Sequence, residues 1–152
     1  MGFKQSIFQW AGRMMFERPA AKLSVVEHAA ELSASGDEVR ARIAKKRPTP
    51  QNVARLRHII GIERWGQRRL RVFLGDPLEM DGHHAYKPTS TDWDSLQTEL
   101  ASTRADTVAL AGQLTTTDLP RTVPHNQFGP LTARGWLQYI RGHARTESKL
   151  MR

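Results

Sequence analysis

The stretch "NVARLRHIIGIERWGQRRL" (residues 52–70) lies in the first half of a chain of 152 residues. Pro50 is a favourable first-turn residue, and "GDP" at residues 75–77 stops a helix, so a helix is expected from about residue 50 to about residue 74. Its apolar residues spread over more than one helical face: Val53, Leu56, Ile59, Ile60, Ile62, Trp65, Leu70 and Phe73. A helix that is apolar over so much of its circumference is expected at the centre of a domain.

Three further segments carry helical periodicity. Apolar residues recur at alternating four- and three-residue steps from residue 24 to about residue 46, and again from residue 91 or 92 to residue 114. This spacing is typical of the seam of a bundle helix. Residues 35–38 resemble a capping box, but the seam passes through them without a change of phase, so one continuous helix with Gly36 at a close contact is expected. Thr132 can cap a last helix that runs to the end of the chain.

Two long segments between these helices are rich in turn residues. Residues 75–90 and 115–131 contain the prolines and glycines that are typical of loops. Neither shows a clear alternation of apolar and polar residues, so no strand is expected. The sequence therefore predicts an all-α fold, a four-helix bundle with two long inter-helix loops. We expect residues 20–152 to form this domain and residues 1–19 to form an N-terminal amphipathic extension helix.

The N-terminal extension carries an apolar face. Phe3, Ile7, Trp10 and Met14 share one side of a helix, and the first acidic residue is Glu17. Such a helix can lie on a membrane surface. It can equally pack on the body of the protein or on a second subunit, which is the interpretation that we favour.

Composition and charge limit the function classes. The chain has no cysteine, which excludes disulfides, thiolate nucleophiles and cysteine-based zinc sites, and it suits a reducing cytoplasm. No apolar run reaches the roughly 18 residues that a membrane span needs. The net charge is +8, and residues 1–75 carry 15 lysines and arginines against 6 acidic residues, a net charge of +9. This asymmetry can indicate an anionic partner, although a well-solvated basic face is the simpler explanation.

The last helix, "GWLQYIRGHARTESKLMR" (residues 135–152), places two polar residues in an apolar stripe. The stripe consists of Trp136, Ile140, His143, Glu147 and Leu150. His143 and Glu147 are one turn apart and can reach one point. His58, among apolar residues of the second helix, is the best third ligand for a divalent metal with an open position, as in catalytic zinc sites or iron facial triads. The alternative is that His58 is a hydrogen-bonded core residue and that His143 and Glu147 form a surface pair, which stabilises a helix by about 0.2–0.5 kcal/mol.

Other histidines and a row of arginines are weaker candidates. His83, His84 and His125 fall in the two expected loops, from which they can assist a site or bind substrate, or simply face solvent. His28 flanks the seam of the first long helix and is expected to be structural. The basic face can bind phosphate or nucleic acid, but no recognition element accompanies it; its arginines are Arg55, Arg57, Arg64, Arg68, Arg69 and Arg71.

Two motifs resemble those of the DinB/YfiT-like proteins. They are "HIIGIE" (residues 58–63) and "RTVPHNQFGPLTARGWLQYIRGHARTE" (residues 121–147). The family meant is the damage-inducible, metal-dependent group, which is distinct from the DNA polymerase that shares the name. The similarity in element order covers roughly residues 23–152. It implies an up-down-down-up four-helix bundle, often dimeric, and a part in a stress response.

The resemblance also implies a metal site. Relatives bind a divalent metal, commonly nickel or zinc, through three histidines, and His58 and His143 match the first two. The third position is occupied by Glu147, where this sequence departs from the family. A carboxylate changes the charge and the preferred metal, so iron and manganese are alternatives. The departure can also mean that tight metal binding has been lost.

Two chemistries follow from the resemblance, both acting on a small-molecule substrate. One is a thiol-dependent transferase or isomerase that uses a low-molecular-weight thiol such as mycothiol, bacillithiol or glutathione. The other is a hydrolase with a metal-activated nucleophile. Glu63 is expected to orient a metal ligand or to act as a base; the alternative for Glu63 is an ordinary pair with Arg64, Gln67 or Arg71.

Two hypotheses that do not involve catalysis are alternatives. In one, the protein is a helical binding module whose basic first half contacts nucleic acid or an acidic protein. Such binding weakens steeply with salt. In the other, the extension attaches the protein to a membrane surface.

Overall fold

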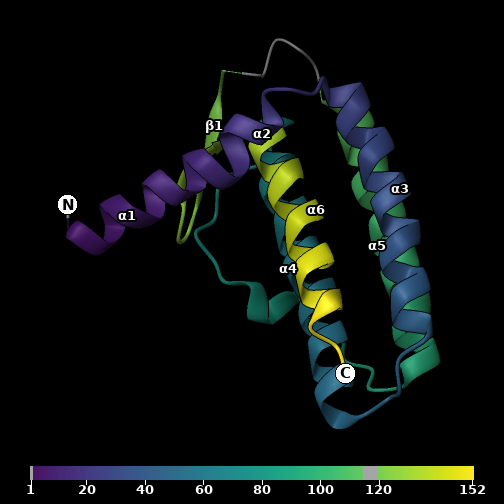
Figure 1. Ribbon diagram of the computed structural model, residues 1–152. Helices are drawn as coiled ribbons and strands as arrows, with labels where there is room; N and C mark the ends of the chain where they lie inside the picture. The colour runs from purple at the N-terminus through teal and green to yellow at the C-terminus, as the bar shows by residue number, and fades with distance from the viewer. Residues whose placement is uncertain (1, 115–119) are drawn as a thin grey trace.

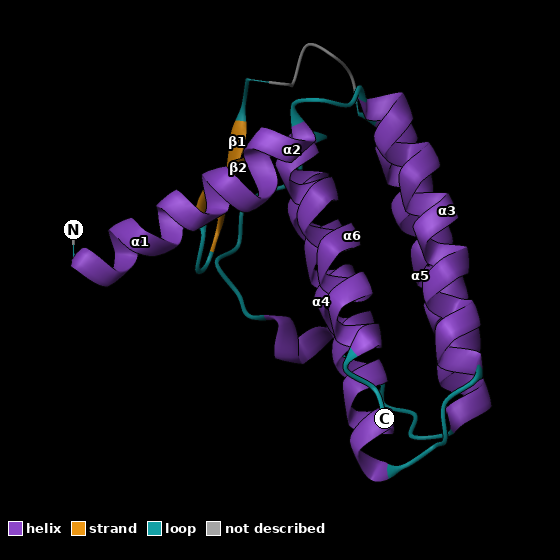
Figure 2. Ribbon diagram, viewed as in Figure 1, coloured by secondary structure: helices purple, strands orange, loops and turns teal. Residues whose placement is uncertain are grey.

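Four long helices make up most of the computed structural model. They are α3 (Val25–Ala44), α4 (Pro50–Phe73), α5 (Trp93–Gln113) and α6 (Ala133–Lys149), and they lie side by side (Figure 1). Helices α3 and α4 each pack against both α5 and α6. The expectation of a mainly α-helical domain is confirmed (Figure 2).

Side-chain caps explain where these helices begin. Ser24 and Glu27 form a capping box at the start of α3, in which each side chain bonds the other residue's backbone N–H. The side chains of Thr49, Asp92 and Thr132 each accept a hydrogen bond from the backbone N–H three residues later. Each cap satisfies one N–H that the first turn leaves without a partner.

Helix α4 is the central helix, as its apolar pattern predicts. Leu56, Ile59, Ile60 and Leu70 are fully buried, and they contribute to the two apolar clusters that form the core. One cluster contains Trp65 and residues of every long helix, and the other lies around Leu56 and Ile59. Because α4 is covered on several sides, the polar side chains on its buried faces are held in defined directions.

Helix α3 passes through Gly36 without a break, as the uninterrupted seam predicts. A Cβ placed on Gly36 would lie 2.7 Å from Cγ of Arg104 on α5. The glycine therefore makes room for a buried arginine side chain between two neighbouring helices.

The structure describes residues 2–114 and 120–152, and the two expected loops prove to be partly regular. A single 3₁₀ turn, η2 (His83–Tyr86), lies in the first. The second contains strands β1 (Thr122–His125) and β2 (Gly129–Thr132), which pair antiparallel. The prediction of a strand-free loop over residues 115–131 was therefore wrong, apart from residues 115–119, which lie outside the described part.

The hairpin has a physical reason for escaping prediction. Each strand has only four residues, and Pro124 of β1 stands opposite Pro130 of β2. Proline is tolerated in edge strands, and both strands of a two-stranded sheet are edge strands. In a sequence, however, proline usually indicates a loop. Gly129 has a φ of 76°, a conformation that glycine adopts readily.

The N-terminal extension is helical and extends slightly beyond residue 19. Helix α1 (Phe3–Gly12) continues through a π-helical turn, η1 (Arg13–Glu17), into α2 (Arg18–Ala20). It projects from the bundle across the hairpin (Figure 1). The carboxylate of Glu17 accepts hydrogen bonds from the backbone N–H and the hydroxyl of Thr132, which joins the extension to the start of α6.

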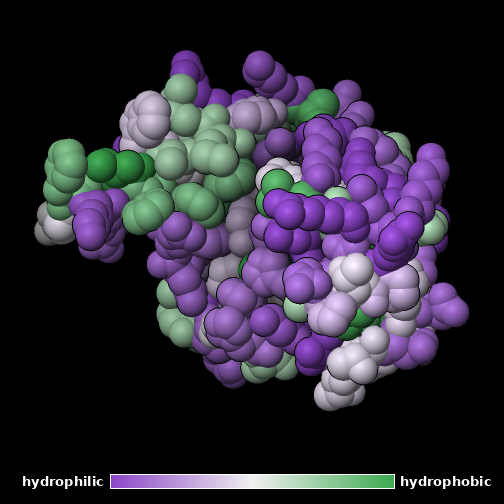
Figure 3. Space-filling view, turned by 60° about the horizontal axis from the view of Figure 1, so that its bottom comes forward, coloured by the Kyte–Doolittle hydropathy of each residue, from purple (hydrophilic) through white to green (hydrophobic). Residues whose placement is uncertain are grey.

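The outer face of the extension is apolar and exposed. Phe3 is 83% exposed, Trp10 58% and Ile7 46%, and a patch of hydrophobic residues is visible on the projecting helix (Figure 3). Among the described helices, none combines the length and the apolar character that crossing a membrane requires.

Candidate metal centre

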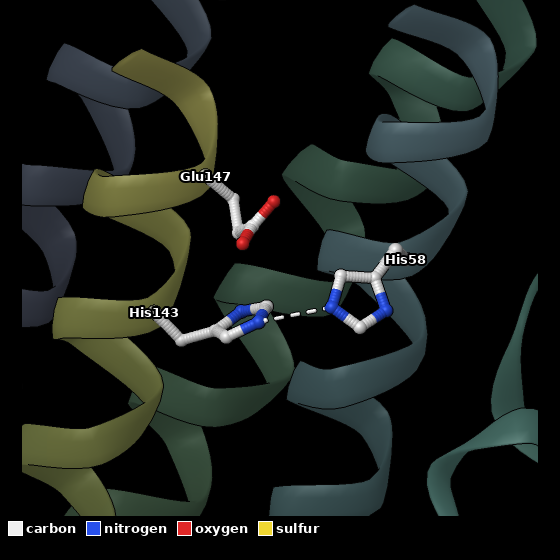
Figure 4. A group of neighbouring side chains, drawn as sticks. All are labelled: His58, His143 and Glu147. Carbon is white, nitrogen blue, oxygen red and sulfur yellow. Dashed lines mark hydrogen bonds between the residues drawn. The ribbon is translucent and has the colours of Figure 1, made fainter. Parts of the chain in front are cut away.

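His58 and His143 face each other across the contact between α4 and α6 (Figure 4). Their Nε2 atoms are 3.2 Å apart. Glu147 lies one turn beyond His143 on the same face of α6, and one possible ligand atom from each of the three residues lies within 4.8 Å of the others. The structure thus brings together the three residues that the sequence analysis selected.

Close helix packing sets this geometry. Gly66 of α4 lies against Ile140 of α6, where a Cβ would come within 2.7 Å of the isoleucine Cδ1 and Cγ1 atoms. Ile140 is buried and precedes His143 by three residues. Gly66 lies about two turns after His58 on α4, so the small residue lets α6 approach closely along the same helix contact that carries the two imidazoles.

Both histidines are neutral near pH 7. Burial lowers the pKa of His143 to about 3, with smaller contributions from the nearby rings of His58, His83 and His125. Burial also lowers the pKa of His58, although the carboxylate of Glu147 acts in the opposite direction. A neutral imidazole keeps a nitrogen lone pair, which is the form that binds a metal.

The donor set suits a divalent ion. Two nitrogens that each lie about 2.1 Å from one ion are separated by roughly 3 to 3.4 Å, and the observed Nε2 separation is 3.2 Å. Two imidazoles with one carboxylate also form the ligand set of many catalytic zinc sites and of iron facial triads. The three side chains therefore match a metal by both chemistry and spacing.

Glu147 already has a cationic partner in α4. Its carboxylate forms an ion pair with Arg55, which lies one turn before His58. Both side chains are only partly exposed, at 21% for Glu147 and 34% for Arg55. The arginine can orient the carboxylate, but its charge also opposes a second cation at the same place.

A cavity of about 520 Å³ adjoins these residues. Its wall includes the aromatic side chains of Phe16, Trp65, Phe128 and Tyr139. The cavity thus receives side chains from the N-terminal extension, α4, the hairpin and α6. The fold of the loops and of the extension determines the shape of the site as much as the bundle does.

Two loop histidines reach the site, and one does not. His83 lines the cavity with its ring edge-on to His58, at 5.2 Å between centroids. His125, the last residue of β1, also lines the cavity and is only 5% exposed. His84 is exposed and absent from the lining. The sequence could not show which of these histidines reach the site and which face solvent, because residues in a loop have no helical periodicity that indicates where their side chains point.

The ring of His125 is fixed by its own turn. Its Nδ1 accepts hydrogen bonds from the backbone N–H groups of Gln127 and Phe128, at 3.0 and 3.2 Å. Nδ1 is therefore unprotonated, and the hydrogen of the neutral ring resides on Nε2. Burial, with the charge of Arg69, lowers the pKa of His125 to about 3. His28, far from the site, bonds the carbonyl of Ala20 and is structural, as expected.

Glu63 lies elsewhere, and the expectation that it serves the metal site was wrong. Its carboxylate forms a buried ion pair with Arg104 of α5 at 2.7 Å and accepts a hydrogen bond from Thr107. Five residues separate Glu63 from His58, which is a rotation of about 140° around a helix. Glu63 therefore faces α5, and its partner is none of the three residues considered from sequence.

Most of the arginine face is used inside the protein. Arg69 is fully buried and donates to the carbonyl of Asp81 and to Oδ1 of Asn126, so it joins both inter-helix segments to α4. Arg64 pairs with Glu99, and Arg68 with Asp76. Arg57 donates to the carbonyl of Pro88. These contacts account for much of the basic stretch without an anionic partner.

Comparison with known proteins agrees with this architecture. The family model described as the DinB superfamily matches residues 8–146, which is most of the chain and includes most of the N-terminal extension. Searches of curated proteins and of solved structures returned no match.

Proposed function

The chain belongs to the DinB superfamily, and from this premise we propose that it is a metal-dependent enzyme whose divalent ion is held by His58, His143 and Glu147. One observation carries the proposal, namely that these residues place one ligand atom each within 4.8 Å of the others beside a cavity. The up-down-down-up helix order and a homodimer, both implied by the family resemblance, belong to the same proposal.

Nickel or zinc is the expected ion, with iron and manganese as alternatives because one ligand is a carboxylate. An ion with an open coordination position supplies a nucleophile near neutral pH by lowering the pKa of a water or thiol. The chain supplies the remaining conditions. Neutral His58 and His143 offer lone pairs, Arg55 orients Glu147, and the aromatic wall limits the access of water.

Two reactions are compatible with this site. A thiol-dependent transferase needs a low-molecular-weight thiol as cosubstrate, since the chain has no cysteine. A hydrolase needs only water. Turnover of an electrophile that requires added thiol supports the transferase, whereas turnover of esters or amides without thiol supports the hydrolase.

The test is elemental analysis of tag-free protein, because a polyhistidine tag binds the same metals. We expect near-stoichiometric nickel, zinc, manganese or iron in the wild type and much less in His143→Ala and Glu147→Ala. Arg145→Ala, on the exposed side of α6, is a matched control that should keep its metal. A wild type that stays metal-free after soaking with each ion would refute the proposal.

A further inference from the structure

The cavity beside the three ligands has a composition that restricts what can occupy it. Among the described residues that line it, none is lysine or arginine, and the only one with a formal charge is Glu147, which is paired with Arg55. An anionic ligand therefore finds no side-chain cation here. Burying an unpaired carboxylate in such a place is costly.

An arginine that lies against the aromatic wall is bound to other groups. The guanidinium of Arg69 lies 5.1 Å from the ring centre of Trp65. It donates, however, to Oδ1 of Asn126 and to backbone carbonyls that include that of Asp81. It also stays out of the cavity lining. Arg69 thus supports the wall from behind and offers no charge to a ligand.

The wall itself is a set of aromatic faces and edges. Trp65, Tyr139 and Phe16 enclose one side, with Phe16 and Tyr139 edge-to-face at 5.3 Å between centroids. Met15 and Ile62 add apolar surface. Aromatic and thioether groups bind flat aromatic ligands well. A volume of about 520 Å³ falls in the lower half of the range for small-molecule sites.

Several polar atoms of the wall have no partner among the described residues, including the buried Nδ1 of His83 and Nε2 of His125. The hydroxyl of Tyr139 makes no hydrogen bond within the described part of the chain, although the residue is only 7% exposed. Burial raises the pKa of Tyr139, and the carboxylate of Glu147 raises it further, so the phenol stays protonated. A donor that the protein itself leaves without a partner favours a ligand that carries an acceptor.

From these observations we propose that the site takes a compact, uncharged aromatic molecule with a hydrogen-bond acceptor, which packs against the wall formed by Trp65 and Tyr139 and accepts a hydrogen bond from the Tyr139 hydroxyl. The inference concerns the surface that the protein side chains offer to a ligand, and it rests on the proposed function for the chemistry alone, because a bound ion would add a positive charge of its own.

The experiment compares two probes of nearly equal shape on the full-length chain in the presence of a chelator. Naphthalene-2-carboxamide is uncharged, and naphthalene-2-carboxylate carries one negative charge. Chelation matters because a carboxylate can bind a metal directly. We expect calorimetry to show at least ten-fold tighter binding of the amide.

Two variants locate the binding. A Cβ on Gly142 meets nothing within 4 Å, although Gly142 lines the cavity, so Gly142→Leu should fill the space and abolish binding with unchanged circular dichroism. Tyr139→Phe should weaken amide binding about five-fold, the value of one hydrogen bond. It should leave binding of naphthalene, which has no acceptor, unchanged.

Three results would overturn the inference: equal or tighter binding of the carboxylate, no binding of either probe at millimolar concentration, or binding that survives Gly142→Leu. None of them depends on the metal content. If elemental analysis finds no metal in the wild type even after soaking, but the protein prefers the amide, the metal-dependent enzyme is refuted and the inference stands. If the protein binds metal in that analysis but shows no preference for the amide in chelator, the inference is refuted and the metal-dependent enzyme stands.

Discussion

Two glutamates show how the position of a residue around a helix determines its chemistry. Glu63 points from α4 toward α5 and is 1% exposed, held by Arg104. Glu147 points from α6 toward the two histidines at the edge of the cavity. From sequence both are carboxylates within five residues of a histidine. Their different roles become clear only when it is known which neighbouring helix each side chain faces.

The buried pair of Glu63 and Arg104 should contribute to stability and have no part in metal binding. Glu63→Gln leaves the arginine charge buried with a neutral partner, so we expect the free energy of unfolding to fall by about 3 kcal/mol or more. Urea denaturation measures the loss. Glu63→Met with Arg104→Met removes both charges and should recover much of it. Metal loss in Glu63→Gln at unchanged stability would contradict this assignment.

Glu147→His restores the third histidine that the family resemblance implies. The ion pair with Arg55 is lost, and a third imidazole replaces the carboxylate. Imidazole suits nickel and zinc, whereas carboxylates suit manganese. We expect a higher affinity for nickel and zinc relative to manganese, measured by competition with a chromogenic chelator. Glu147→Gln serves as the control, with weaker binding of all three ions. An unchanged preference in Glu147→His would show that residue 147 is not a ligand.

The low pKa of His125 should appear in the pH dependence of stability. Its pKa of about 3 in the folded protein lies below the value of about 6.5 in the unfolded chain. The unfolded state therefore binds the proton more tightly, and the stabilisation present above pH 6.5 is lost as the pH falls toward 3.

Within that window, a buried histidine such as His125 should lower the free energy of unfolding by about 1.4 kcal/mol for each unit by which the pH falls. Urea titrations of metal-free protein between pH 7 and pH 4 measure the slope. The His125→Gln variant should show a shallower slope than the wild type. Equal slopes would mean that the His125 ring titrates normally.

At the scale of helices, two glycines offer a matched pair of tests. A Cβ on Gly66 would meet buried Ile140, whereas a Cβ on Gly112, in the exposed part of α5, meets nothing within 4 Å. Gly112→Ala should stabilise the protein by about 0.5 to 1 kcal/mol through helix propensity.

Gly66→Ala gains the same propensity but forces α4 and α6 apart, at a cost of about 1 to 3 kcal/mol. We expect its melting temperature to fall and its metal affinity to drop, because His58 and His143 lie on the two helices that this change moves apart. A Gly66→Ala variant as stable as Gly112→Ala, with full metal affinity, would rule out this role for the contact.

Helix boundaries and the central place of α4 were predictable, and the connections were not. Caps such as Ser24 and Thr132 act on their own first turn, so local sequence carries the information. The hairpin depends on pairing between Thr122 and Thr132, ten residues apart, and its prolines conceal it. The two loop histidines were visible as candidates, but their approach to the site depends on Arg69, which fixes both connections to α4 from within the core.

At the scale of the whole molecule, the basic first half and the projecting extension call for different explanations. The arginines of α4 are largely occupied by acids and carbonyls of the same chain. A nucleic-acid module should show binding that weakens steeply with salt, and nothing in the arrangement of these arginines favours one. The extension is different, because its apolar face has no partner among the described residues.

The homodimer implied by the family resemblance stays a prediction, and α1 offers the surface for it. Exposed apolar patches on soluble proteins commonly mark interaction sites, and a two-fold dimer lets one patch cover its own copy. We expect light scattering with size exclusion to show a dimer for the wild type and a monomer for the combined Phe3→Ser, Ile7→Ser and Trp10→Ser variant. Val26→Ser, an equally exposed apolar change on α3, is the control and should stay dimeric.

The inner face of the extension should be unaffected by those three changes. Glu17 still bonds Thr132, and Phe16 still packs in the core. The metal content and the cavity should therefore survive in the monomeric variant. A wild type that is already monomeric would remove the dimer, and flotation with anionic liposomes would then decide whether the same face binds a membrane. Loss of flotation in the triple variant would assign the face to lipid, because the changes remove apolar surface and leave every charge in place.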